Sequence, residues 1–228
     1  MTDIPDLPQT EAAIIALTNS FRRSERLGEV TPSKVLTAAA HAFAAYLAKS
    51  GSFAHEADGR TPAARATAAG YRYCAIAENL ALDMDSRGFS TGRLAAEAMA
   101  GWRNSPPHRK NLLAPDVTEI GVGIAKAADK EKYLSVQLLG RPQSLSYSFK
   151  IENRTGWTIS YTAGLQTVEL KPRFIMTHSP CGPVAVTFQK ASQGIFKSQP
   201  LDMTRRVAGK AHYVIEAVGD TITVGEGP

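Results

Sequence analysis

Hydrophobic and polar positions follow helical spacing through most of the first half of the chain. Ile14, Leu17 and Phe21 fall on one face of a predicted helix over residues 11–27, and Thr10 stands where a helix cap is expected. The same spacing predicts further helices at residues 33–50, 61–70 and 90–104, with a short helix at 105–113 that is capped by Ser105. Residues 73–82 predict a turn or a short helix.

The pattern changes after Pro115. Residues 119–127 and 132–140 are β-rich runs separated by "ADKEK", which predicts a hairpin. Helices followed by a small antiparallel sheet are typical of a layered α+β domain. We place its end near Arg141 and its limits at residues 8–142.

In the rest of the chain, residues 143–228, hydrophobic and polar residues alternate with the period of a β-strand. Residues 147–151 and 157–161 flank "NRTG", which predicts a hairpin with that segment as its turn. Further strands are predicted at residues 166–170, 173–178, 184–189, 211–217 and 220–224. Short strands at this spacing favour a small all-β, sandwich-like domain. The triplet Asn153-Arg-Thr also has the pattern of a glycosylation site, but the turn is the better-supported interpretation.

Composition narrows the class of protein. The net charge is +5 and the isoelectric point is near 9.2. Residues 1–142 carry 17 basic and 15 acidic side chains, and the remainder carries 9 and 6, so the excess is spread thinly. Nucleic-acid binding normally needs a clustered basic surface, so we exclude it. No apolar run approaches the roughly 20 residues of a membrane span. The opening "MTDIPDLPQT" lacks a signal sequence, so the protein is either cytoplasmic or Met1 opens a mature segment.

Only two cysteines are present, Cys74 and Cys181. Neither belongs to a CxxC pair, which excludes a structural zinc site built on thiolates. They form one disulfide in an oxidising compartment or remain two buried thiols, and spacing alone does not decide between these alternatives.

Two of the five histidines stand in contexts that favour chemistry. His55 follows the end of a predicted helix and His108 lies near the start of another, whereas His41, His178 and His212 lie within predicted elements. Histidine is the side chain whose charge and metal affinity change near neutral pH. His55 and its neighbour Glu56 point in different directions, so any partners of His55 lie elsewhere in the chain.

Six segments resemble the CAP superfamily, which comprises cysteine-rich secretory proteins, antigen 5 and pathogenesis-related 1 proteins. In order they are "LTNSFR", "SFAHEADGR", "RATAAGY", "AENLA", "GWRNSPPHRKNLL" and "TEIGVGIA". Their order and spacing are similar to those of the family's bacterial SCP-type branch. The resemblance covers roughly residues 8–142 and implies an α-β-α sandwich. It does not cover the tail.

The resemblance also implies a cleft lined by two histidines and two acids. Residue by residue, it assigns His55, Glu78 and His108 to three of these positions. The fourth, an acid three residues after Trp102 in eukaryotic members, is Ser105 here. Glu97 lies on the same predicted helix but would face another way.

Two neutral imidazoles and a carboxylate suit Zn²⁺ or another divalent cation with water at an open position. Alternatively, Glu78 accepts the far N–H of one ring, or the pair only satisfies buried polar groups. Asn19 and Arg22 match the family's Asn-x-x-Arg beside the cleft, where anchoring of the first helix is favoured over ligand contact.

Three functions follow as expectations. The first is an extracytoplasmic, secreted or periplasmic, non-enzymatic module that binds a divalent metal, a lipid, a peptide or an envelope component in the cleft. The second is a zinc-assisted hydrolase of peptides or envelope polymers, with Glu78 as base and His108 as a metal ligand, or with Ser105 as nucleophile activated by His108. The third is a purely structural interaction protein. We favour the first because the second acid is missing.

Overall fold

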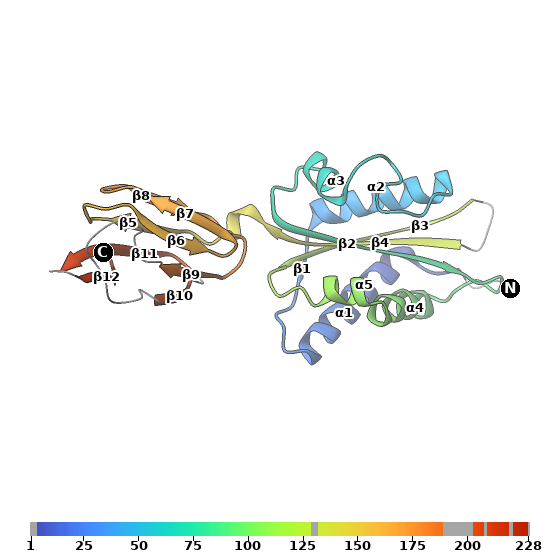
Figure 1. Cartoon of the computed structure of the whole chain (residues 1–228). Helices are drawn as coiled ribbons and strands as arrows, with labels where there is room; N and C mark the ends of the chain where they lie inside the picture. The colour runs from blue at the N-terminus through green and yellow to red at the C-terminus, as the bar shows by residue number, and fades with distance from the viewer. Residues whose placement is uncertain (1–3, 129–131, 189–202, 208, 219–220, 228) are drawn as a thin grey trace. The chain divides into compact units, whose positions relative to one another are not determined.

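The computed structural model describes residues 4–128, 132–188, 203–207, 209–218 and 221–227 (Figure 1). The chain divides into two compact units, residues 1–144 and 145–228, called here the N-terminal and C-terminal units. Each unit has its own hydrophobic core.

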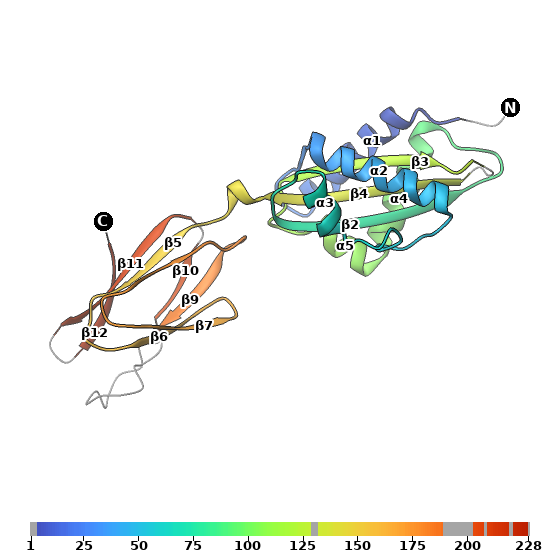
Figure 2. The same ribbon diagram turned by 90° about the horizontal axis from the view of Figure 1, so that it is seen from above.

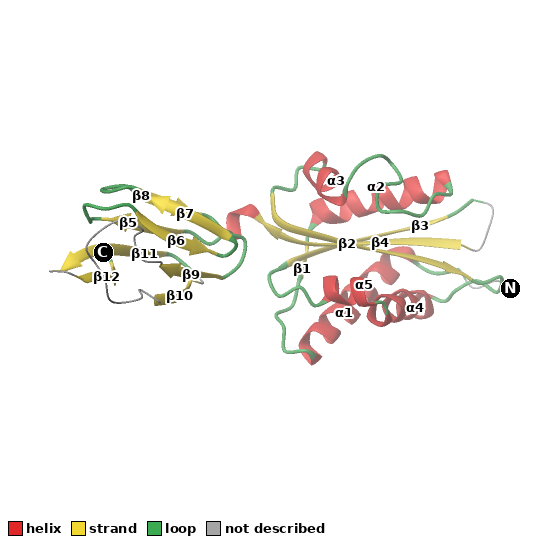
Figure 3. Ribbon diagram, viewed as in Figure 1, coloured by secondary structure: helices red, strands yellow, loops and turns green. Residues whose placement is uncertain are grey.

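The N-terminal unit consists of a four-stranded sheet between two layers of helices. The strand order is β1-β3-β4-β2. Helices α2 and α3 cover one face, and α1, α4 and α5 cover the other (Figures 1 and 3). The predicted α-β-α sandwich is therefore confirmed. The elements are α1 (Leu7–Ser24), β1 (Thr31–Pro32), α2 (Lys34–Ser50), α3 (Pro62–Ala68), β2 (Tyr73–Met84), α4 (Thr91–Asn104), α5 (Pro106–Leu112), β3 (Glu119–Lys126) and β4 (Lys132–Pro142).

Helix α1 begins earlier than the spacing predicts. Asp6 is its cap, and its carboxylate accepts the backbone N–H of Gln9 at 2.9 Å. The prediction that Thr10 caps this helix is wrong. Thr10 lies inside the helix and is fully buried, and its hydroxyl donates to the Asp6 carbonyl. The predicted stop of α2 is confirmed, because Gly51 has φ +72°.

Two glycines of β3 allow α2 to lie directly on the sheet. A β-carbon at Gly121 would come within 2.2 Å of the Leu36 carbonyl carbon, and one at Gly123 within 2.3 Å of the His41 amide nitrogen. These distances are far below normal contact. The two glycines of "GVG" in the "TEIGVGIA" segment are therefore needed for α2 to pack on the sheet.

Residues 73–82, predicted as a turn or short helix, form most of strand β2, so that prediction is wrong. Strand β2 pairs antiparallel with β4 from Tyr73 opposite Pro142 to Met84 opposite Lys132. Alanine, leucine and glutamate in this segment favour a helix locally, but the long antiparallel pairing with β4 outweighs that preference. Glu78 therefore lies on a strand.

The C-terminal unit is all β, as predicted, and contains two four-stranded sheets (Figure 2). Their orders are β10-β9-β6-β7 and β12-β11-β5-β8. Strand β10 was not predicted. The strands are β5 (Phe149–Asn153), β6 (Ile159–Ala163), β7 (Gln166–Leu170), β8 (Ile175–His178), β9 (Val184–Phe188), β10 (Met203–Val207), β11 (Ala211–Val218) and β12 (Thr221–Glu226). Residues 189 and 220 of the predicted strands, and 129–131 of the predicted "ADKEK" connection, lie outside the described residues.

The predicted hairpin around "NRTG" is wrong, because β5 and β6 belong to different sheets. Asn153 makes the crossing possible. Its side-chain amide, fully buried, donates to the carbonyls of Trp157 and Leu170 at 2.7 and 2.9 Å, and its oxygen accepts the Thr155 amide at 3.0 Å. Since Asn153 has no exposed surface, the triplet that begins with it is not open to glycosylation in the folded chain.

Candidate functional site: two histidines and a buried carboxylate

His55 lies in the loop between α2 and α3 and is bound to Glu78 of β2. Its Nδ1 is 2.8 Å from Glu78 Oε1. The histidine side chain is 49% exposed, whereas that of Glu78 is 1% exposed. The carboxylate thus holds the ring at Nδ1 and fixes its orientation, while the far nitrogen, Nε2, has no bonded partner among the described residues.

Arg65 of α3 takes up the rest of the Glu78 carboxylate. Its Nη2 lies 2.9 Å from Oε1 and 2.7 Å from Oε2, and also donates to the His55 carbonyl at 2.8 Å. Its Nη1 donates to Asp58 at 2.8 Å. Arg65 was not predicted from the sequence. The available signal was a single arginine in the otherwise uncharged helix "PAARATA".

His108 lies in the first turns of α5 beside Ser105, and a hydrogen bond of 2.9 Å joins Ser105 Oγ and His108 Nδ1. We expected the Ser105 hydroxyl to cap α5. Ser105 does occupy the N-cap position, but its side chain makes no capping hydrogen bond. The expectation is therefore wrong for the hydroxyl, which is bound to the histidine instead.

Burial and the nearby charge of His55 set the protonation of His108. The pKa of His108 is lowered, first by burial and second by the charge of His55. Both Nδ1 atoms are engaged, and no residue in the described part of the chain is bonded to either Nε2. A lowered pKa keeps His108 neutral at neutral pH, which is the form that binds metals and accepts hydrogen bonds.

A buried polar network fixes the segments that carry the two histidines. Asn111 of α5 donates to the Glu78 carbonyl at 3.0 Å and to Asn79 at 2.9 Å. Asn79 donates to Gln137 at 2.9 Å, and Gln137 donates to Thr18 at 2.9 Å. Because these groups are satisfied by one another, the network links α1, β2, β4 and α5 rigidly beneath the site.

Asn19 and Arg22 anchor the chain. Asn19 exchanges two hydrogen bonds with the backbone of Val30, at 3.0 and 2.9 Å. Arg22 has no exposed surface and donates to the carbonyls of Gly28, Leu112 and Ala114. Burial lowers its pKa. These contacts are the ones expected of residues that anchor the first helix rather than of residues that contact a ligand.

Within the described residues no group of three histidine, cysteine or acidic side chains is arranged to hold a metal ion. Glu78 is occupied by Arg65 and His55, and Glu97 lies 3.8 Å from Arg93 on α4. Glu78 is thus a partner of His55 and Arg65, and the two imidazole Nε2 atoms are left without a bonded partner among the described residues.

The other three histidines bond within the units. His41 Nε2 lies 2.9 Å from Glu11, and His212 Nε2 lies 3.0 Å from Glu152. His178 stacks on Phe149 with ring centroids 4.8 Å apart and shares a hydrogen bond of 2.7 Å with the Tyr161 hydroxyl.

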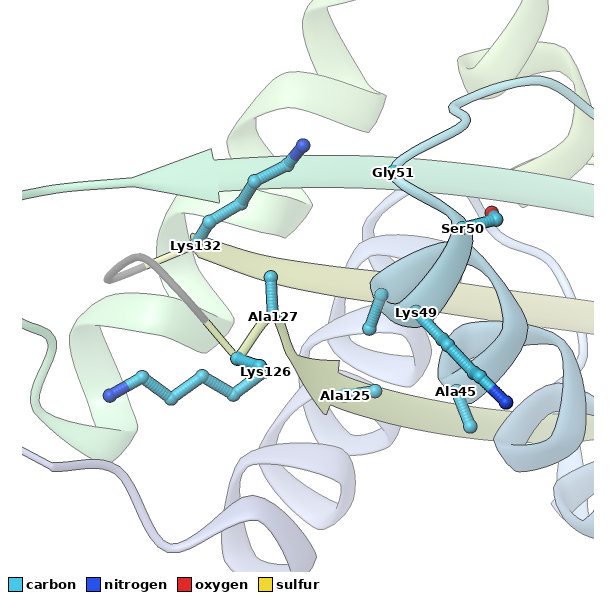
Figure 4. A pocket seen from close by; sticks show the side chains of 10 residues that line it. Ala45, Lys49, Ser50, Gly51, Ala125, Lys126, Ala127 and Lys132 are labelled. Carbon is cyan, nitrogen blue, oxygen red and sulfur yellow. The ribbon is translucent and has the colours of Figure 1, made fainter.

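A separate hollow of about 650 Å³ lies between the end of α2 and the β3–β4 hairpin (Figure 4). Lys49, Lys126 and Lys132 line it, but their side chains point in different directions and do not converge on one ion (Figure 4). Neither His55 nor His108 lines this hollow.

The two cysteines are oxidised. Cys74 and Cys181 are both disulfide-bonded, and neither is free. Of the alternatives left open by the sequence, the disulfide is the one that the structure shows. In the described part of the chain, no helix combines the length and apolarity needed to cross a membrane.

Residues 15–139 match the sequence model of the cysteine-rich secretory protein family, CAP. The chain belongs to the CAP family. The N-terminal unit is thus a CAP domain, as the resemblance implied, and the matched residues include all the site residues named above.

The chain is similar to solved structures, and the first of them has the same architecture as the CAP domain. An outer surface protein of Borrelia burgdorferi aligns with a TM-score of 0.52 and 21% identity, covering 58% of this chain and 92% of that one. An extracellular SCP-domain protein of Bacillus anthracis aligns with a TM-score of 0.48 and 25% identity, covering 59% of this chain and 41% of that one. No functionally curated protein matches the sequence.

Proposed function

We propose that this protein is a non-enzymatic binding module that acts outside the cytoplasm and holds a divalent cation weakly through His55 and His108. The observation that carries the proposal is the engagement of Glu78. With both carboxylate oxygens on Arg65 and one also on His55, Glu78 is neither a free base nor an open ligand.

The donor chemistry fits a two-imidazole site. A histidine whose Nδ1 donates to a carboxylate has its lone pair on Nε2, the arrangement seen around metal-binding histidines. His55 has this arrangement with Glu78. Ser105 offers His108 the equivalent partner at Nδ1. The bound cation would supply a Lewis-acidic point whose remaining positions are open to a carboxylate or carbonyl of a partner.

The extracytoplasmic setting is supported by the oxidised cysteines. Disulfides persist in secreted and periplasmic proteins and are rare where thiols are kept reduced. Both cysteines of this chain are disulfide-bonded. The similar proteins from Borrelia and Bacillus carry the descriptions outer surface protein and extracellular protein.

Zinc-assisted hydrolysis is the less favoured alternative. A catalytic zinc normally has three protein ligands and a nearby base, and two ligands with an occupied carboxylate fall short of both. The serine version has one contact in its favour, the bond between Ser105 and His108. Within the described residues, however, no acidic side chain is bonded to His108, so the third member of a triad is absent.

Calorimetric titration with zinc tests the proposal. We expect weak binding by the wild type, loss of binding in His55→Ala/His108→Ala, and unchanged binding in His41→Ala, an exposed histidine paired with Glu11. Equal binding by all three proteins would show that zinc binds elsewhere. A peptidase screen with and without zinc tests the alternative function. Zinc-dependent turnover that is lost in His108→Ala would show that the protein is a hydrolase rather than a non-enzymatic binding module.

A further inference from the structure

A groove of about 570 Å³ lies between α2 and α3, on the helical layer opposite α1, α4 and α5. Ala38 and Ala42 of α2 and Ala69 after α3 form part of its wall, with Phe43 and Tyr46. Helices of globular proteins usually turn charged side chains to solvent. Here the exposed residues along the groove are mostly alanine, so the surface is shallow and apolar.

Tyr46 gives the groove its aromatic face, because the ring of Phe43 is covered by the Arg65 guanidinium, whose carbon lies 3.4 Å from the ring centroid. The rings of Phe43 and Tyr46 are stacked, with centroids 6.4 Å apart and planes inclined by 12°. Phe43 is buried, whereas Tyr46 is 41% exposed. The Tyr46 hydroxyl donates to the Ala57 carbonyl at 2.9 Å, which holds its ring in place. A rigid aromatic face beside methyl groups suits a planar apolar group.

One cation, Arg60, lines the groove without an ion-pair partner among the residues that the structure describes, and it is exposed. Its backbone is held at two points: its N–H donates to Asp58 at 3.1 Å, and its carbonyl accepts Arg65 Nη1 at 2.7 Å. The buried Arg65 thus fixes the turn that presents Arg60.

Asp58, the acid that also lines the groove, is paired with Arg65. Its carboxylate lies 2.8 Å from Arg65, whose side chain is only 6% exposed. Arg65 is shared between Asp58 and Glu78, whereas Arg60 has no carboxylate partner among the described residues, so Arg60 is the group of the groove that can pair with an anion. An apolar groove with a few charged groups is the usual form of a small-molecule site.

We propose that the α2–α3 groove binds a small planar apolar carboxylate, with its ring against Tyr46 and the alanines and its carboxylate paired with Arg60. The site is distinct from the two histidines and does not depend on a metal. Arginine is suited to this role because its guanidinium pairs with a carboxylate through two parallel hydrogen bonds.

The test uses 2-naphthoate as the probe and the full-length protein. In ¹H–¹⁵N spectra we expect 2-naphthoate to shift the backbone amides of α2 around Ala42 and those of α3. Arg60→Ala should weaken binding by about fivefold, as for a partly exposed ion pair. The uncharged analogue 2-naphthalenemethanol should bind to the wild type about as weakly as naphthoate binds to Arg60→Ala.

A matched pair of variants locates the site. Ala42→Glu places a bulky negative side chain in the groove and should abolish naphthoate binding. Ala45→Glu makes the same change on an exposed position of the same helix, where Ala45 lines the other hollow, and should leave binding intact. Circular dichroism melting shows that each variant is folded.

Three outcomes would overturn the proposal: no binding of naphthoate, amide shifts confined to α1 and α4, or equal loss in Ala42→Glu and Ala45→Glu. Equal affinity for 2-naphthoate and 2-naphthalenemethanol would show that Arg60 does not contribute to binding, and it would contradict the assignment of a carboxylate ligand. His108→Ala should bind naphthoate normally, so this result is independent of the zinc titration.

Discussion

Arg65 holds both carboxylate oxygens of Glu78 through one guanidinium nitrogen, at 2.9 and 2.7 Å, in the interior of the CAP domain. The side chains are 6% and 1% exposed. This pair decides the character of the site, because it turns the acid that would serve as a base or ligand into a support for His55. It also links that support to the turn that presents Arg60.

Removal of Arg65 should destabilise the CAP domain strongly. Arg65→Ala leaves the Glu78 carboxylate buried with a single histidine partner, and loss of one member of a buried ion pair costs about 3–5 kcal/mol. Urea unfolding followed by the fluorescence of the buried Trp102, in a Trp157→Phe background, measures this loss. Arg65→Met/Glu78→Leu should recover most of the stability, and failure to recover would show that the charge pair itself was not the cause.

Gly123→Ala should destabilise the domain by about 2 kcal/mol or more, because the added methyl group meets the backbone of α2 at Ala40 and His41. Gly101→Ala is the matched control. Gly101 lies in α4 with open space around the position of a β-carbon, so alanine there should stabilise the helix by about 0.5–1 kcal/mol. Thermal melts compare the two. A neutral Gly123→Ala would mean that α2 lies farther from β3 than described.

Asn153→Ala should destabilise the C-terminal unit by about 2–3 kcal/mol, since it leaves buried backbone carbonyls and the Thr155 amide without their partner. Hydrogen exchange of the amides in β5 and β6 measures the change within this unit. Lys150→Ala, an exposed position on β5, is the control and should have little effect. Fast exchange confined to the loop would show that Asn153 orders the loop alone.

The C-terminal unit should lose stability in mild acid. Burial lowers the pKa of His178, and burial raises the pKa of its partner Tyr161 to about 12, so the neutral imidazole accepts the phenol proton. Unfolding then takes up a proton. Stability falls as the pH drops below about 6.5, the value for an unfolded histidine, and levels off below the lowered folded pKa.

Hydrogen exchange at pH 7.5 and 5.5 tests this dependence, and His178→Gln should flatten it. An equal pH dependence in the variant would assign the effect to another group.

The sequence predicts the helices of the CAP domain well because their apolar spacing and stop signals are local. It fails at β2, where the antiparallel partner lies more than fifty residues away. It also fails at "NRTG", where Asn153 redirects the chain between sheets. In the site, His55 and His108 stand out by their sequence context and Glu78 came from the resemblance, whereas the engagement of Glu78 by Arg65 depends on three-dimensional contacts that no spacing reveals.

The central claim is that zinc binds at the Nε2 atoms of two histidines while Glu78 stays behind His55. Long-range ¹H–¹⁵N spectra of the imidazoles during a zinc titration test it most directly. We predict that the Nε2 signals of His55 and His108 move together, with their Nδ1 signals and all signals of His41 nearly unchanged. Movement of neither ring, or of one ring alone, would contradict the account.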